Sequence, residues 1–549
     1  MTPSEVPTLK RLFTLIGALA LLNASLSFHN IWPTPAIGWR GEISIEFAIV
    51  LLLVIAARRW LLPPSRALLG SMTAVWLLLV AGHYADVTTP ALYGRDINLY
   101  WDVRYMPDVG AMVVRAAPLW LVVLATTAIV LIVALLYLMF RWSLRRVTEA
   151  MADARARRCI GGGAAAACVV FAGQHLMARP SSEAYRFEPP IAFATPVTET
   201  YLRQARLVID ARSGSKSLGA SPPMDADLAL VRDADVFLVF IESYGAISFE
   251  RPEIAPRLDA SRQALDAAIR ETQRDVVSAY VVSPTFGGSS WLAHLSLMSG
   301  VEVRDAASNA SLMAQQRDTI VTTFKRHGYR TIALMPGLRQ RWPEGAFYRF
   351  DDVYGAARLD YRGPEFGWFA VPDQFSLARF EALERSQPSS VPRFVFFPTI
   401  STHFPFTPTP PYQPEWPRML TPTPYSGRAI VDAYAQQPDW TSFGPGYVTA
   451  MSYTYATIAG YLRVIADRDR VLILLGDHQP AAAVSGEGAA WDVPVHVIVR
   501  KGAASDRSRI LDRLVARGFR PGLTPQRPPL GPMHTLLPIL LDAFSGDRN

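Results

Sequence analysis

The sequence predicts a domain of membrane-spanning helices followed by an α/β domain with a mostly parallel sheet. The chain has 549 residues and is 50% apolar, which is too apolar for an ordinary soluble enzyme, and the excess lies in the first 180 residues. From residue 235 onward, short apolar strands alternate with helical stretches. This alternation is typical of a parallel sheet with crossover helices.

Five apolar stretches are long enough, or nearly so, to cross the roughly 30 Å hydrocarbon core of a bilayer. The clearest begins at Leu119, whereas the second carries Glu42 and Glu46 near one end and the fifth is rich in Gly and Ala. We expect transmembrane helices at 12–31, 43–62, 67–85, 117–140 and 159–178.

Basic residues predict how these helices are oriented. They cluster before the first span, between the second and third, and between the fourth and fifth, so that with five spans all the clusters fall on one side. The positive-inside rule makes that side the cytoplasm. The net charge of +7 then reflects membrane topology and is weak support for nucleic-acid binding. The clusters are Lys10 and Arg11; Arg58, Arg59 and Arg66; and Arg141, Arg145, Arg146, Arg155, Arg157 and Arg158.

Three regions follow from this reading. Residues 1–180 form the transmembrane domain, 181–230 a polar linker with a short amphipathic helix near 197–211, and 231–549 an extracytoplasmic domain. Both cysteines, Cys159 and Cys168, lie in the fifth span, so the outer domain has no disulfide.

Apolar runs and helical patterns in the outer domain give its expected elements. Strands are predicted at 236–241, 278–283, 330–335, 393–398, 471–475 and 494–499. Helices are predicted at 256–273, 289–300, 316–327, 373–386, 447–467 and 507–517. The proline-rich stretch 404–426 can be neither helix nor central strand, and we expect a surface loop that is either a lid or a plain connector.

Two of the predicted strands end in residues that bind metals. Glu242 follows the apolar run 236–241, and Asp477 and His478 follow 471–475. An acidic residue at one strand end is more often a cap or a turn residue, but two such ends at one sheet edge indicate a metal site. Carboxylates and imidazole suit Mn²⁺, Mg²⁺ or Zn²⁺.

A glycine turn places hydroxyl groups at the start of a predicted helix. Gly287 and Gly288 allow a tight turn, and Ser289 and Ser290 follow them. Serine at a helix start is usually an N-cap. A metal-activated nucleophile would stand in the same place, and the residues leave open which serine fills which role.

These segments, in this order, resemble a known family. Glu242-Ser243 after a strand, the glycine turn with a helix ending in Ser299-Gly300, Thr402-His403-Phe404-Pro405-Phe406, and Gly476-Asp477-His478 are similar to the sulfatase-like branch of the alkaline phosphatase superfamily. The resemblance extends in particular to lipoteichoic acid synthases, phosphoglycerol transferases and phosphoethanolamine transferases, which have five transmembrane helices. It implies a multi-pass protein of the bacterial inner membrane with a periplasmic catalytic domain.

The resemblance also implies a role for individual residues. One divalent ion, Mn²⁺ or Zn²⁺ with Mg²⁺ as a third candidate, would be held by Glu242, Ser290, Asp477 and His478. Ser290 would be the nucleophile, in a position where the family usually has Thr. The substrate would be bound by His403, which either holds phosphate oxygens or assists proton transfer, by Trp342, and by Arg339 or Arg341. Around the substrate, Glu344 and His294 depart from the family pattern.

The implied activity is transfer of a phosphoglycerol or phosphoethanolamine head group from a membrane phospholipid to a glycan or glycolipid, through a phospho-serine. A phosphodiester or sulfate-ester hydrolase with the same site is an alternative, and a non-catalytic membrane scaffold is another. Sulfatases require Cys or Ser in the pattern C/S-x-P-x-R, whereas Trp291, Leu292 and Ala293 follow the serines here. Sulfate hydrolysis by that route is therefore disfavoured.

Overall fold

A computed structural model of the chain divides into two compact units, which we describe separately. The helical unit comprises Met1–Leu92 and Asp96–Arg212, and the α/β unit comprises Tyr93–Arg95 and Ser213–Asn549. The structure describes residues 5–547 apart from 33, 61–64, 100–101, 104–105, 107–109, 111–118, 178–190, 214–217, 340–341, 343, 368–369, 387–390, 440–441 and 503–506. Arg341 and parts of the predicted linker lie outside the described residues.

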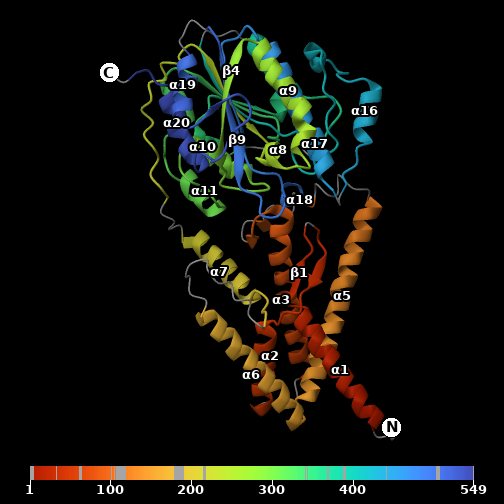
Figure 1. Cartoon of the computed structure of the whole chain (residues 1–549). Coiled ribbons are helices and arrows are strands. Elements are labelled where there is room, and N and C mark those ends of the chain that lie inside the picture. The colour runs from red at the N-terminus through yellow and green to blue at the C-terminus, as the bar shows by residue number, and fades with distance from the viewer. Residues whose placement is uncertain are drawn as a thin grey trace. The chain divides into compact units, whose positions relative to one another are not determined.

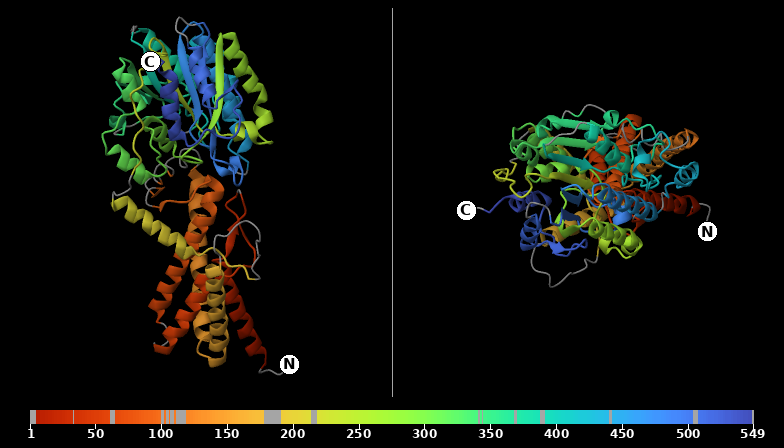
Figure 2. Two further views of the ribbon diagram at one scale, coloured as in Figure 1. Left: turned by 60° about the vertical axis from the view of Figure 1, so that its left-hand side comes forward. Right: turned by 90° about the horizontal axis from the view of Figure 1, so that it is seen from above.

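The helical unit is built from long apolar helices. Among the described residues, α3, α5 and α6 are long and apolar enough to cross a membrane, which fits a membrane protein, while α2 is a shorter apolar helix. The expected number of five spans is not confirmed by this criterion. Figure 2 shows the helices running beside one another, with α1 packed on α5 and α2 on α6. The helices are α1 (Glu5–Ala24), α2 (Ile45–Trp60), α3 (Arg66–Tyr93), α5 (Leu119–Ala150), α6 (Ala154–Met177) and α7 (Val197–Ser213), and a small hairpin pairs β1 (Phe28–Asn30) with β2 (Ile37–Trp39).

The predicted amphipathic helix is α7, and it is anchored to the helical unit. The buried Glu46 carboxylate accepts hydrogen bonds from the backbone N–H of Thr198 (3.0 Å) and from its hydroxyl (3.1 Å). A carboxylate at a helix N-terminus satisfies free N–H groups and complements the helix dipole. Further along, Arg203 pairs with Asp86. Glu46, an unexpected charge in a predicted span, therefore holds the first turn of α7.

An eight-stranded sheet in the order β10-β4-β9-β8-β3-β7-β5-β6 forms the centre of the α/β unit. The pairings from β8 to β6 are parallel, whereas β9 pairs antiparallel with both β8 and β4, and β10 pairs antiparallel with β4. The sheet is thus mixed, with a parallel part that contains all the strands beside the candidate site. The strands are β3 (Asp235–Ile241), β4 (Arg274–Val282), β5 (Arg330–Met335), β6 (Asp352–Gly355), β7 (Arg393–Pro398), β8 (Arg470–Gly476), β9 (Asp492–Arg500) and β10 (Arg520–Pro521).

Helices cover both faces of this sheet, which is why its central strands are apolar on both sides. Figure 1 shows α9 and α17 on one face and α10, α19 and α20 on the other. Val236, Leu238 and Phe240 of β3 point into the core beneath α10 and α20, while Phe237 and Val239 pack into the core beneath α9 and α17. Alternate residues of one strand therefore serve two separate cores.

The larger predicted helices are present with shifted ends, as α9 (Ala255–Glu271), α10 (Ser290–Ser299), α12 (Ile320–Arg326), α15 (Asp373–Ser386), α17 (Gly444–Val464) and α19 (Ser508–Ala516). Within 404–426 the only regular element among the described residues is a short 3₁₀ helix, η1 (Trp416–Leu420). The helices of the α/β unit that were not predicted are α8 (Ile247–Glu250), α11 (Ala306–Met313), α13 (Gly345–Tyr348), α14 (Ala356–Leu359), α16 (Gly427–Tyr434), α18 (Ala482–Ser485), η2 (Met533–Thr535) and α20 (Leu536–Phe544).

Candidate metal centre and nucleophile

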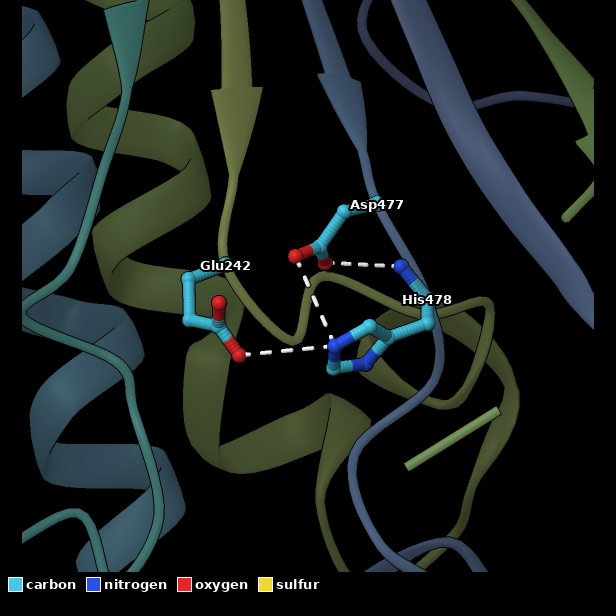
Figure 3. A group of neighbouring side chains, drawn as sticks. All are labelled: Glu242, Asp477 and His478. Atoms are coloured by element: carbon cyan, nitrogen blue, oxygen red, sulfur yellow. Dashed lines mark hydrogen bonds and ion pairs between the residues drawn. The ribbon is translucent and has the colours of Figure 1, made fainter. Parts of the chain in front are cut away.

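The candidate site lies where the neighbouring parallel strands β3 and β8 end. Ile241 is in register with Gly476, so Glu242 and Asp477 leave the sheet side by side. Figure 3 shows Glu242, Asp477 and His478 directed toward one another, and their ligand atoms all lie within 4.8 Å. The three residues are 8%, 1% and 2% exposed. The topology alone therefore assembles two carboxylates and an imidazole in one buried place.

Hydrogen bonds fix which atoms of His478 face the carboxylates. Its Nδ1 lies 2.8 Å from the carbonyl oxygen of Gln479, which can only accept, so Nδ1 carries the proton. Nε2 lies 3.5 Å from Glu242 Oε1 and 3.5 Å from Asp477 Oδ2. In its neutral form His478 therefore presents its Nε2 lone pair to the centre of the group, as a metal ligand would.

The negative charges of Glu242 and Asp477 are only partly neutralised by neighbouring side chains. Burial, followed by the charge of Glu242, raises the pKa of Asp477 to about 6. Burial alone would lower the pKa of His478, but the charges of Asp477 and Glu242 raise it overall. No Lys or Arg pairs with either carboxylate in the described part of the chain. Buried carboxylates need a partner charge, and this donor set fits a divalent cation.

Ser290 completes the group. Its Oγ lies 3.1 Å from Glu242 Oε2, to which it donates, and 3.2 Å from His478 Nε2. Gly287, Gly288 and Ser289 have φ of 64°, 144° and 62°, so three left-handed residues in succession turn the chain sharply and present Ser290 as the first residue of α10. The N-cap is Ser289, yet its side chain makes no capping hydrogen bond. The geometry thus brings Ser290, rather than Ser289, to the carboxylates.

His403 lies near this group on the loop after β7. Its Nδ1 is 2.8 Å from the carbonyl oxygen of Phe404, which makes Nδ1 the protonated nitrogen and Nε2 the acceptor of the neutral ring. Burial lowers the pKa of His403, and Asp477 and His478 are close enough for their charges to act on it. Burial therefore favours the neutral form of His403, within reach of the charges of the candidate site.

Trp342 and Arg339 occupy other surroundings. The Trp342 ring stacks on Tyr348, with centroids 5.7 Å apart, and lies near Phe350. Arg339 is exposed and lines a surface hollow together with Asp360 and Tyr361. Their role in binding substrate remains a prediction.

Several residues that hold the backbone of the site in place were not predicted from the sequence. The Glu242 backbone is held at both ends, because its N–H donates to Thr399 Oγ1 (3.0 Å) and its carbonyl accepts from Thr402 Oγ1 (2.5 Å). Asp373 accepts from the backbone N–H groups of Ile400 (2.9 Å) and Ser401 (2.8 Å) and so fixes the loop that carries His403. Thr402 adjoins His403 in the motif and could have been singled out, whereas Thr399 and Asp373 carry no signal in the sequence.

His496, which falls in the predicted strand 494–499, lies inside a directional chain of hydrogen bonds. Ser278 Oγ donates to the Gly522 carbonyl and therefore accepts from His496 Nδ1 (2.7 Å), while Tyr244 OH lies 3.0 Å from Nε2. Tyr455 in turn donates to Tyr244 (3.2 Å). A second proton on the ring would break this chain, and burial lowers the pKa of His496 to about 3.

This burial predicts a stability loss in acid. The folded pKa of His496 is below the unfolded value of 6.5, so only the unfolded chain gains a proton as the pH falls below 6.5. We expect His496 to make the α/β unit less stable at pH 5 than at pH 7 by about 2 kcal/mol. Urea unfolding at both pH values checks this, with His496→Gln, whose amide can replace both hydrogen bonds, as the comparison. An equal pH dependence in both proteins would contradict the assignment.

Comparison with known proteins agrees with the motif order. Residues 289–495 match the Sulfatase family. No curated protein matches the chain. Similar solved structures include lipooligosaccharide phosphoethanolamine transferase A (EptA) from Neisseria meningitidis, at 14% identity over 88% of this chain and 88% of that chain with a TM-score of 0.43. Another is the lipoteichoic acid synthase LtaP from Listeria monocytogenes, at 14% identity over 54% of this chain and 72% of that chain with a TM-score of 0.36.

A third is the phosphoglycerol transferase GacH from Streptococcus pyogenes, at 12% identity over 62% of this chain and 90% of that chain with a TM-score of 0.33. The matched stretch 289–495 contains Ser290, His403, Asp477 and His478. Residues 289–495 are therefore similar to the Sulfatase family, which bears out the resemblance predicted from the order of the motifs.

Proposed function

We propose that the protein is a metal-dependent transferase that moves a phosphoglycerol or phosphoethanolamine head group from a phospholipid to a hydroxyl of a glycan or glycolipid. It would act at the outer face of the bacterial inner membrane. The observation that carries the proposal is the position of Ser290 Oγ, 3.1 Å from Glu242 Oε2 and 3.2 Å from His478 Nε2. A hydroxyl in this setting is placed to become a nucleophile.

The first half of the reaction forms a covalent enzyme. Ser290 Oγ attacks the phosphorus of the head group, the Oγ–P bond forms, and the bond from phosphorus to the diacylglycerol oxygen breaks. The hydroxyl proton leaves toward Glu242 Oε2, to which the hydroxyl already donates. The diacylglycerol oxygen takes up a proton from water as it departs, and the proton that His403 gains in the second half returns to water. The product is a phospho-serine that carries glycerol or ethanolamine.

The second half transfers the group. An acceptor hydroxyl attacks the phosphorus, its new O–P bond forms, and the bond to Ser290 Oγ breaks, so that Ser290 regains its proton. His403 is suited to take the acceptor proton, because its Nδ1 is committed to the Phe404 carbonyl and its Nε2 is the accepting nitrogen. Burial lowers the pKa of His403 and so favours the neutral ring that this role requires.

A divalent cation fits the four donors Glu242, Ser290, Asp477 and His478. When bound, it would lower the pKa of the serine hydroxyl and neutralise charge on the phosphoryl oxygens. Two carboxylates, one imidazole and one hydroxyl suit Zn²⁺ or Mn²⁺. The apolar helices α3, α5 and α6 would keep the domain on the membrane that contains its donor lipid.

The alternative functions differ in the fate of the covalent group. A hydrolase would pass it to water, and a scaffold would never form it. The buried carboxylates beside a serine argue against a scaffold, since a domain with no chemistry gains nothing from two poorly neutralised charges.

The test uses purified full-length protein with a divalent metal and, in separate reactions, phosphatidylglycerol and phosphatidylethanolamine. We expect diacylglycerol release and a mass increase on the peptide that carries Ser290, with the added mass identifying the transferred group. A glycan acceptor should then discharge the adduct and carry its mass. Diacylglycerol release without any adduct, or discharge to water alone in the presence of acceptors, would contradict the transferase proposal.

A further inference from the structure

The backbone carbonyl oxygen of Gln479 joins the candidate metal ligand His478 to the turn that presents Ser290. This oxygen accepts a hydrogen bond from His478 Nδ1 (2.8 Å) and a second one from the backbone N–H of Gly287 (3.0 Å). A carbonyl oxygen has two lone pairs, so both are engaged. Gly287 is the first of the three left-handed residues that lead into Ser290. One atom therefore holds both the imidazole and the turn that carries the candidate nucleophile.

The side chain of Gln479 is buried, and its amide group is hydrogen-bonded on both sides. It is 1% exposed, and its Nε2 donates to the carbonyl oxygens of Ala490 (2.8 Å) and Asp492 (3.0 Å). Its Oε1 accepts a longer hydrogen bond from the backbone N–H of Ile247 (3.5 Å). Buried polar groups whose donors and acceptors are paired are held rigidly. The side chain therefore anchors Gln479 to the segment that leads into β9 and to the start of α8.

Two neighbouring residues restrict Gln479 further. Pro480 follows it, and a residue before proline is largely limited to extended backbone conformations, which narrows the directions that its carbonyl can take. Gly245 packs directly against the amide, because a Cβ atom built on Gly245 would lie 1.6 Å from Gln479 Oε1. Gly245 belongs to the loop that follows β3 and begins at Glu242. Gln479 therefore contacts the loop after β3 as well as the turn before α10.

We propose that Gln479 is a positioning residue that holds the imidazole of His478 and the turn before Ser290 in one fixed arrangement. Metal-ligating histidines usually donate their second ring N–H to a neighbouring acceptor, which orients the ring. Here the acceptor also holds the turn, so a shift of this carbonyl would move His478 Nε2 and Ser290 Oγ, which lie 3.2 Å apart, relative to each other. This inference rests on the metal site of the proposed function.

The experiment compares the full-length wild type with Gln479→Met, which keeps the length of the side chain and removes its donors and its acceptor. Gln479→Asn, which keeps an amide on a shorter side chain, serves if the methionine protein does not fold. Metal-stripped proteins are titrated with Co²⁺, whose visible absorption reports the number and geometry of its ligands. Diacylglycerol release from phosphatidylglycerol and from phosphatidylethanolamine is measured on the same proteins with Zn²⁺ and with Mn²⁺.

We expect the Gln479 variants to change the Co²⁺ absorption band and to weaken Co²⁺ binding by about tenfold to a hundredfold, the usual effect of removing a partner that orients a ligand. The kcat for diacylglycerol release should fall by a similar factor. KM should change little, because the variants alter the arrangement of ligand and nucleophile and leave the predicted substrate-binding residues in place.

Gln413→Met is the matched control that separates positioning from stability. Gln413 is also buried, at 8% exposed, and its amide donates to the Pro424 carbonyl (2.6 Å) and accepts from the Glu415 N–H (3.0 Å). Its loss should lower the urea midpoint of the α/β unit but leave the Co²⁺ spectrum and kcat unchanged. A wild-type spectrum and kcat in the Gln479 variants, or the same changes in Gln413→Met, would overturn the inference. A wild type that binds neither Co²⁺ nor Zn²⁺ would instead contradict the proposed function.

Discussion

Ser290→Ala is expected to lower the transfer rate by roughly a thousandfold or more and to abolish the covalent adduct. The reason is geometric, because Ser290 Oγ is the hydroxyl that lies against both Glu242 and His478. Alanine keeps the start of α10 intact while it removes both the nucleophile and one candidate metal ligand. Diacylglycerol release and peptide mass, measured with the metal content of each protein, check this result.

Ser289→Ala is the matched control. Ser289 precedes Ser290 and is the N-cap of α10, but its side chain makes no capping hydrogen bond, so its loss should leave the rate within a few-fold of wild type. An adduct on Ser289, or an active Ser290→Ala protein, would show that the two serines have been assigned the wrong way round.

The second large effect concerns the opposite ends of the same strands. Arg470, the first residue of β8, is 1% exposed and contacts the carboxylates of Glu381 and Asp235. Its guanidinium also lies over the Phe237 ring at 4.8 Å. Arg470→Met removes the charge and leaves two acidic groups without this partner. Breaking a buried ion pair on one side typically costs about 3–5 kcal/mol, a large share of the stability of a domain.

Thermal and urea unfolding of the full-length variant should therefore show a strong loss of stability in the α/β unit, or no folded protein at all. Arg463→Ala is the comparison, because Arg463 pairs with Glu271 at 2.9 Å with both side chains about half exposed. Such surface pairs contribute about 0–1 kcal/mol. If the two variants unfolded alike, the ion network around Arg470 would have no special role in stability.

The sequence predicted the parallel part of the sheet because those strands are buried on both faces and read as unbroken apolar runs, as Val236–Ile241 does. It missed β6 (Asp352–Gly355), which is short and begins with a charge, and β10, which has two residues. It also ended the third apolar helix at 85, whereas α3 continues through Pro90 to Tyr93. Short edge strands and helix ends depend on tertiary packing that local patterns do not encode.

The candidate metal group was predictable because sheet topology places the carboxyl ends of neighbouring parallel strands together, which fixes Glu242 beside Asp477 before any side-chain detail is known. Trp342 and Arg339 were predicted from the family resemblance alone. Their role stays a prediction because, among the residues that the structure describes, no hydrogen bond links either of them to the metal group in the way that register links Glu242 to Asp477. Asp373 and Thr399 reach the site through hydrogen bonds across long stretches of chain, and neither has a local pattern that marks it.

Strand β8 carries Arg470 at one end and is followed by Asp477 at the other, about 23 Å apart at the rise of a β-strand. The ion pairs that are expected to stabilise the domain and the carboxylate of the candidate metal site therefore lie at opposite ends of one strand. Stabilising substitutions near the amino-terminal ends of these strands should therefore raise the stability of the domain without changing the candidate metal site. Substitutions at that edge are expected to change thermal stability more than activity.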